Sequence, residues 1–150
     1  MTSGEKYQEN VNGKEDMDNY SEGSRRSTVD SVFIPFKTKK TFNQRLTESK
    51  NIKSRFPNKI PIIVERYSKE KNLPLLDKTK YLVPQELTLS QFVLILRNRM
   101  EIKSEQTIYL LINNKSMVTM SSTVSQIYEV DKDPDGFLYM TYASQEMFGV

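Results

Sequence analysis

Apolar and polar residues are distributed differently before and after residue 30. Residues 1–30 have almost no apolar pattern and are rich in serine, asparagine, aspartate, glutamate and glycine. A segment of this kind cannot bury enough surface to offset the entropy that it loses on ordering. We therefore predict a disordered tail over residues 1–30 and one folded domain over residues 31–150.

Two helices are predicted at the start of the domain. A short turn of helix over Phe36 to Lys39 is followed by Thr41 and Gln44, which have the spacing of a capping box. Helical spacing then relates three apolar residues that we expect to face the core: Phe42, Leu46 and Ile52. Pro57 ends this second helix.

Four strands are predicted in the rest of the domain. The β-branched run KIPIIVERY, near Lys59 to Tyr67, is typical of a buried strand. A shorter strand is predicted over KYLVP, Lys80 to Pro84, where the proline stops it. The other two are QTIYLLIN, near 107–113, and FLYMTYAS, over 137–144.

Two further helices are predicted between these strands. Thr88 with Gln91, and Thr123 with Gln126, again have capping-box spacing. The first of these helices carries an apolar stripe: Leu89, Phe92, Val93 and Leu96. The second is short and runs through Tyr128. This order of elements is that of an α+β, ubiquitin-like β-grasp, a four-stranded mixed sheet preceded by two N-terminal helices.

The composition argues against an enzyme. The chain has no cysteine and no histidine, so disulfides, zinc sites built on Cys or His, and Ser–His or Cys–His catalytic pairs cannot form. Carboxylate or lysine chemistry stays open on paper, but no constellation of residues points to it, and we expect no cofactor. The chain also lacks a run of about 18 apolar residues and a secretory signal, which predicts a cytosolic or nuclear protein.

The net charge of +3 hides an asymmetry. Residues 1–30 hold seven acidic and four basic groups, so residues 31–150 have a net charge of +6. A basic domain of this kind suits acidic peptides, anionic lipid surfaces or nucleic acid, and charge alone does not choose among them.

One acidic stretch matches the opening of a calcium-binding loop. Asp131 to Gly136 reads D-x-D-x-D-G, but the twelfth position, where such a loop needs a bidentate glutamate, is Tyr142. We therefore predict a tight acidic turn, set by Pro134 and Gly136, and no metal site.

The strand KYLVP has the marks of a sheet edge. Lys80 and Leu82 lie on one of its faces. Tyr81 and Val83 lie on the other. A strand that carries lysine and ends in proline is typical of an edge, and an edge can accept an extended peptide as an added strand. The sequence leaves open whether Lys78 and Lys80 attract such a peptide or only protect the edge from aggregation.

Several long stretches resemble one protein family. They are RFPNKIPIIVERY, LDKTKYLVPQELT, NNKSMVTMSSTVSQIYE and DPDGFLYMTYASQEMFG. They are similar to the autophagy ubiquitin-like modifiers of the microtubule-associated light-chain-three type, and less so to the GABA-receptor-associated branch. The resemblance runs from about Phe36 to Gly149 and leaves the acidic tail outside.

The resemblance implies chemistry at the C-terminus. Members of the family are cut after a terminal glycine by a cysteine protease, and E1-, E2- and E3-like enzymes then join that glycine to phosphatidylethanolamine. Here the glycine is Gly149, which follows Phe148, and Val150 is the residue to be removed. Glycine lacks a Cβ and so lets a thiolate approach its carbonyl.

The resemblance also implies two pockets for aromatic-x-x-aliphatic motifs of cargo receptors, bound as an added strand. The aromatic pocket would use Glu48, Ile52, Pro61, Ile63, Lys80, Leu82 and Phe137. The aliphatic pocket would use Tyr81, Val83, Pro84, Phe92, Ile95 and Leu96. Acidic residues beside the motif would meet Lys39, Lys40, Lys78 and Arg99. Glu48, where aspartate is usual, and Asn98, which interrupts an arginine run, depart from the family pattern.

Two functional hypotheses follow. The first is a conjugated modifier that is cytoplasmic until lipid on Gly149 anchors it to the autophagosome membrane, where its edge strand recruits receptors. The second is a non-conjugated basic adaptor that binds tubulin or RNA through basic residues of the N-terminal helices: Lys37, Lys39, Lys40, Arg45, Lys50 and Lys53. Binding of the second kind should weaken steeply with salt and survive loss of Gly149.

Overall fold

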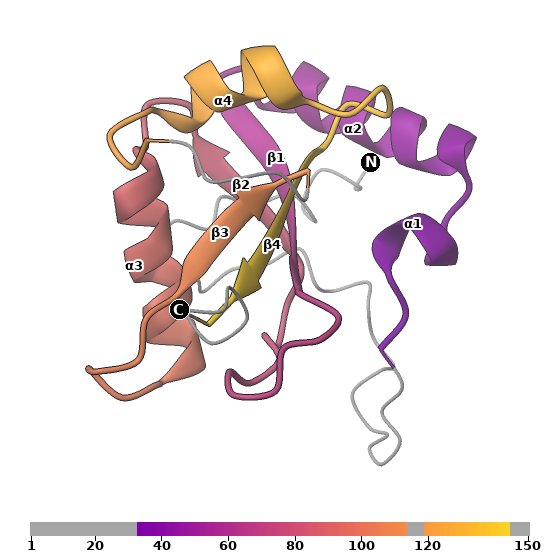
Figure 1. Cartoon of the computed structure of the whole chain (residues 1–150). Coiled ribbons are helices and arrows are strands. Elements are labelled where there is room, and N and C mark those ends of the chain that lie inside the picture. Colours follow the sequence, from indigo (N-terminus) through magenta and orange to yellow (C-terminus); the bar gives the residue numbers. More distant parts are fainter. Residues whose placement is uncertain (1–32, 114–118, 145–150) are drawn as a thin grey trace.

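One mixed four-stranded sheet organises the domain in the computed structural model, which describes residues 33–113 and 119–144 (Figure 1). The elements run in the order α1 (Phe36–Lys39), α2 (Phe42–Arg55), β1 (Lys59–Arg66), β2 (Lys80–Pro84), α3 (Leu89–Met100), β3 (Tyr109–Ile112), α4 (Val124–Asp131) and β4 (Leu138–Ala143). Each predicted element is present, with ends that differ from the prediction by at most three residues.

The strand order in the sheet is β2-β1-β4-β3. The two central strands, β1 and β4, are parallel, whereas β2 and β3 pair antiparallel with them from the outside. A parallel central pair with antiparallel hairpin partners is the ubiquitin-like β-grasp, and the predicted α+β fold is therefore confirmed.

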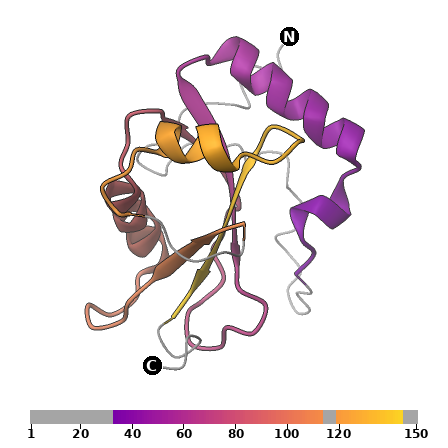
Figure 2. The ribbon, with the colours of Figure 1, turned by 45° about the horizontal axis from the view of Figure 1, so that its top comes forward.

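Helices cover both faces of the sheet. Figure 2 shows α1 and α2 on one side of the sheet and α3 on the other. Because side chains alternate along each strand, the sheet supplies two apolar clusters. The larger lies with α3 and α4, and the smaller lies with α1 and α2.

Local sequence signals set the helix starts. Capping boxes are formed at Thr41, Thr88 and Thr123, where each hydroxyl accepts from the backbone N–H of a glutamine three residues on. Each of these glutamine side chains in turn accepts from the N–H of its threonine, so two backbone donors of every helix start are satisfied.

The predicted core face of α2 is confirmed for Ile52 and wrong for the other two residues. Phe42 is 43% exposed, and Leu46 is only half-buried. The buried face instead consists of three polar residues and one apolar residue: Arg45, Glu48, Ser49 and Ile52. The reason is tertiary, because this face packs against a polar turn from the far end of the chain.

That turn is the acidic stretch of residues 133–136, and it is a tight turn as predicted. The N–H of Gly136 donates to the carbonyl of Asp133 at 2.8 Å. The Asp135 carboxylate is fully buried, and it accepts from the Arg45 guanidinium at 2.6 Å and from the Tyr139 hydroxyl at 2.5 Å. Among the residues of the two described ranges, no group of acidic side chains is placed to hold a metal ion.

Candidate functional site

Strand β2 is an outer strand of the sheet, as its lysine and proline predicted. Its register with β1 pairs Leu82 with Pro61, which has no N–H to donate. The neighbouring bonds, from Val64 N–H to Thr79 carbonyl and from Gln85 N–H to Asn58 carbonyl, set the alternation of the ladder. By that alternation the amide and carbonyl of Leu82 point away from β1, toward the outer edge.

The side chains of β2 serve both clusters. Tyr81 and Val83 are fully buried in the cluster with α3. Leu82 is fully buried in the cluster with α2. The predicted alternation is confirmed, and β2 therefore contributes side chains to an apolar cluster on each face of the sheet.

The aromatic-pocket prediction brings together residues that the fold does place side by side. Four of them, Ile52, Ile63, Leu82 and Phe137, form one fully buried cluster. A fifth member, which was not predicted, is Phe36 of α1, whose ring meets that of Phe137 edge-on at 5.2 Å between centroids. Its helical turn was predicted, but no local pattern indicates that its ring packs against residue 137.

A group of three charged side chains lies over the edge of this cluster. The Glu48 carboxylate accepts hydrogen bonds from Lys80 Nζ at 2.7 Å and from Lys40 Nζ at 3.0 Å, and forms an ion pair with each. The same ammonium groups lie 5.3 and 5.7 Å from the centre of the Phe36 ring, within the range of a cation–π contact. These contacts connect α1, α2 and β2 at one point.

Burial and charge act against each other in this group. Burial alone would raise the pKa of Glu48, but Lys80 and Lys40 outweigh it and hold that pKa below 4.5. Burial lowers the pKa of Lys80 from 10.5 to about 8, although the Glu48 carboxylate opposes this shift. Lys80 is therefore a half-buried lysine that is mostly protonated at pH 7 and loses its proton near pH 8.

All but Pro84 of the residues predicted for the aliphatic pocket belong to the cluster with α3. Four of them are fully buried: Tyr81, Val83, Phe92 and Leu96. Pro84 and Ile95 are half-buried, so they are the members of the set that offer apolar surface. Tyr81 meets Phe92 edge-on at 5.6 Å, which ties β2 to α3.

The four basic residues predicted to meet an acidic flank differ in their surroundings. Lys39 is exposed, while Lys40 lies in the group around Glu48. Lys78 is only 4% exposed, and its ammonium lies 5.4 Å from the centre of the Tyr81 ring. The Arg99 guanidinium contacts both carboxylate oxygens of Asp77 at 3.0 Å. An acidic ligand would therefore approach Lys39 directly and would compete with Asp77 for Arg99.

The predicted conjugation residues Phe148, Gly149 and Val150 lie outside the described residues. Ser144, which directly follows β4, is the last described residue.

A β-grasp sheet with helices on both faces and an outer strand between two apolar clusters defines a ubiquitin-like protein. The family model "Autophagy protein Atg8 ubiquitin like" matches residues 44–149. The human "Microtubule-associated protein 1 light chain 3 gamma" is 57% identical over 115 residues, which cover 77% of this chain and 78% of that protein. "Protein lgg-2" of Caenorhabditis elegans is 41% identical over 128 residues, covering 85% and 98%. "Autophagy-related protein 8c" of Arabidopsis thaliana is 40% identical over 115 residues, covering 77% and 95%.

The chain belongs to the Atg8 family of ubiquitin-like autophagy proteins. The resemblance to the light-chain-three type of this family is thereby confirmed.

Proposed function

We propose that this protein is a modifier, not an enzyme, which is cleaved after Gly149 and conjugated there to phosphatidylethanolamine. Conjugated in this way, it recruits cargo receptors to autophagosomal membranes by adding their aromatic-x-x-aliphatic motifs to β2. The observation that carries the receptor half of the proposal is the outer strand β2, whose Leu82 backbone points outward between two apolar clusters.

The lipid half of the proposal is supported by the family match, which extends to Gly149. Within residues 33–113 and 119–144 no helix is both long and apolar enough to cross a bilayer. A lipid on Gly149 supplies a membrane anchor whose strength depends on the length of the buried acyl chains. A processing cysteine protease and E1-, E2- and E3-like enzymes are the partners that this chemistry requires.

The adaptor hypothesis has less support from the basic residues on which it relies. Three of the six are paired with acidic side chains of the domain: Lys37 with Asp133, Lys40 with Glu48, and Arg45 with Asp135. Arg45 is moreover buried against a fully buried partner, so it is unavailable to tubulin or RNA without unfolding of the turn.

One reconstitution tests the lipid half. The full chain is incubated with the family's processing protease, its conjugation enzymes, ATP and phosphatidylethanolamine liposomes, and the C-terminal peptide is weighed by mass spectrometry. We expect loss of Val150 and gain of one lipid, both absent in Gly149→Ala. An unchanged C-terminus under conditions that process a known family member would contradict the proposal.

Peptide titration tests the receptor half. A fluorescent aromatic-x-x-aliphatic peptide with an acidic flank is titrated into wild-type protein, Lys80→Gln and Lys103→Gln. Lys103 is an exposed lysine of the α3–β3 loop and serves as the matched control. We expect at least tenfold weaker binding for Lys80→Gln and less than twofold change for Lys103→Gln. Equal binding by all three proteins would remove Lys80 from the site.

A further inference from the structure

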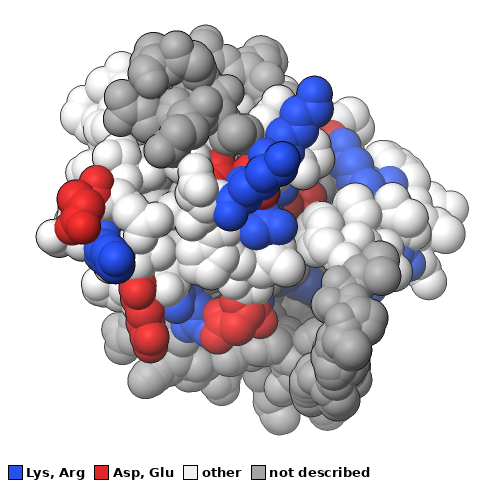
Figure 3. Space-filling view, turned by 60° about the horizontal axis from the view of Figure 1, so that its bottom comes forward, with Lys and Arg blue, Asp and Glu red and all other residues white. Residues whose placement is uncertain are grey.

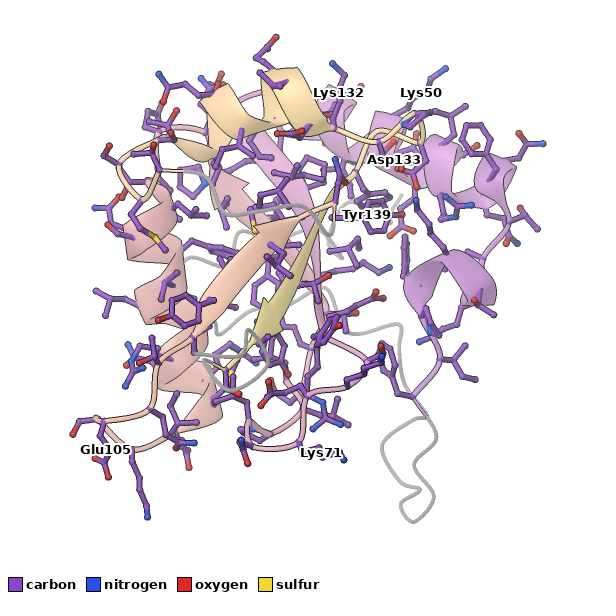
Figure 4. The ribbon with its side chains drawn as sticks, in the orientation of Figure 1. Lys50, Lys71, Glu105, Lys132, Asp133 and Tyr139 are labelled. Carbon is purple, nitrogen blue, oxygen red and sulfur yellow. The ribbon has the colours of Figure 1, made fainter. Side chains whose placement is uncertain are left out.

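The end of β4 and the loop that follows β1 lie at the same end of the sheet, where the two central strands finish. Because β1 and β4 are parallel neighbours, their C-terminal ends meet there. The Tyr67 N–H continues the contact by donating to the carbonyl of Tyr142 at 2.9 Å. Figure 3 views the molecule from this end, where Lys and Arg side chains gather near the centre with acidic side chains beside them. Figure 4 labels Lys71 of this loop at the same end.

Glu70 of this loop has an unusual environment for a carboxylate. It is only 2% exposed, although its chain neighbours Lys69 and Lys71 are exposed. One of its oxygens accepts from the backbone N–H of Asn72 at 2.9 Å and of Leu73 at 2.8 Å, which are contacts within its own loop.

The other oxygen reaches the last described residue of the chain. Oε1 of Glu70 accepts from the backbone N–H of Ser144 at 2.7 Å and from its hydroxyl at 2.9 Å. Buried carboxylates that accept several bonds are costly to disturb, because each orphaned donor loses its partner away from water. Burial alone would raise the pKa of Glu70, but these hydrogen bonds outweigh it and keep the pKa below 4.5. The carboxylate therefore stays ionised at neutral pH.

The loop that carries Glu70 is itself held at several points. The Arg66 guanidinium donates to the carbonyl of Leu73 at 2.9 Å. The Tyr142 hydroxyl donates to the carbonyl of Pro74 at 2.7 Å and accepts from the Leu76 N–H at 3.1 Å. Leu73 is buried in the core at 1% exposure. Glu70 thus connects a loop that is hydrogen-bonded to the sheet with the residue that follows β4, Ser144.

We propose that Glu70 is a positioning residue for C-terminal processing: by binding Ser144 it fixes the point from which Gly149 is presented to the protease and the conjugation enzymes. This inference rests on the proposed function. Gly149 lies five residues beyond Ser144, so an extended chain places it at most about 17 Å from this anchor. With so short a reach, the direction in which the chain leaves Ser144 decides whether the glycine arrives at an enzyme's cleft while the domain is docked.

The experiment measures cleavage of the full chain by the family's processing protease under steady-state conditions. Glu70→Gln replaces one acceptor oxygen by an amide, and Ser144→Ala removes the hydroxyl donor while it keeps the backbone N–H. Glu86→Gln and Ser68→Ala are the matched controls, because both residues are exposed. Thermal melting of every variant shows the folded fraction at the assay temperature.

We expect kcat to fall at least tenfold in Glu70→Gln and about threefold in Ser144→Ala. KM should stay within twofold of the wild-type value, because the domain still docks on the protease and only the placement of the glycine is lost. Both controls should retain the wild-type kcat. If both Ser144→Ala and Glu70→Gln are folded and have the wild-type kcat, the inference is overturned and the proposed function is not affected. A wild-type chain that is not cut would instead contradict the proposed function, and with it the role of Glu70.

Discussion

Gly136 occupies a backbone conformation that residues with a side chain rarely adopt. Its φ is +94°, and a Cβ added there would lie 2.2 Å from Ser49 Oγ. Gly136→Ala should therefore lower the free energy of unfolding by about 2–4 kcal/mol, measured by urea denaturation. If the clash contributes, the double variant with Ser49→Gly should lose less than the sum of the two single variants. Additive losses would assign the whole effect to backbone strain.

A second prediction concerns the ionisation of Lys80. Its pKa of about 8 reflects burial, which disfavours the cation, partly offset by the Glu48 carboxylate. Glu48→Gln removes the favourable charge and leaves the burial, so the pKa of Lys80 should fall below 8. NMR titration of the Lys80 side chain measures this. Asp77→Asn is the control, because Asp77 pairs with Arg99, and it should leave the Lys80 titration unchanged. An upward shift of the Lys80 pKa in Glu48→Gln would show that Glu48 does not stabilise the charged form of Lys80.

The sign of this shift also determines a dependence of stability on pH. The folded chain releases the Lys80 proton near pH 8, whereas the unfolded chain retains it until about pH 10.5. Raising the pH between these values therefore favours the folded state, with a slope of at most about 1.4 kcal/mol per pH unit. Urea denaturation from pH 7.5 to 9.5 should give a less positive slope for Lys80→Met than for wild type. Parallel slopes would show that Lys80 titrates alike in both states.

At the scale of elements, α1 is a four-residue helix whose buried side chain is that of Phe36. Phe36 is 4% exposed, and its N–H donates to the Glu65 carboxylate at 2.8 Å. Phe36→Ala should lower the free energy of unfolding by about 2–3 kcal/mol, less than a central core residue, because the short helix can detach by itself. Phe33→Ala is the control, since Phe33 is 41% exposed and should cost under about 0.5 kcal/mol. Similar losses in both would show that α1 is not docked through Phe36.

Strand β2 allows a direct test of strand addition. The Leu82 amide points away from β1, while those of Tyr81 and Val83 point toward it by the alternation of the ladder. A bound aromatic-x-x-aliphatic peptide should slow hydrogen exchange of the Leu82 amide at least tenfold and change its two neighbours much less. NMR-detected exchange with and without peptide measures this. Uniform slowing along β2 would indicate general stabilisation, not an added strand.

At the scale of the whole molecule, the segment 1–30 opposes the charge of the domain. Its removal raises the net charge from +3 to +6. The shortened chain should therefore bind phosphatidylserine vesicles more tightly at low salt, without any conjugation, and lose the difference at about 0.5 M salt. Vesicle co-sedimentation of both chains measures this, with neutral phosphatidylcholine vesicles as control. Equal binding at low salt would mean that the segment does not screen the domain.

The sequence by itself determined where the helices and strands lie and that β2 is an outer strand of the sheet. Capping boxes place the helix starts, and alternation along KYLVP separates Lys80 and Leu82 from Tyr81 and Val83, because both signals act between residues a few positions apart. Lysine and proline in a short strand sufficed to identify an outer strand. These are local constraints, and a single sequence contains them in full.

Only the tertiary structure decided which polar residues are buried and what they contact. Arg45 faces inward because Asp135, 90 residues later, lies beneath it, and Phe42 is left exposed on the same helix. Glu70 is buried at the end of the central strands, where it binds Ser144, a residue 74 positions later in the sequence. The periodicity of a sequence does not show whether a polar side chain bonds to a buried partner or to water. These pairs therefore could not be predicted before the arrangement of the strands was known.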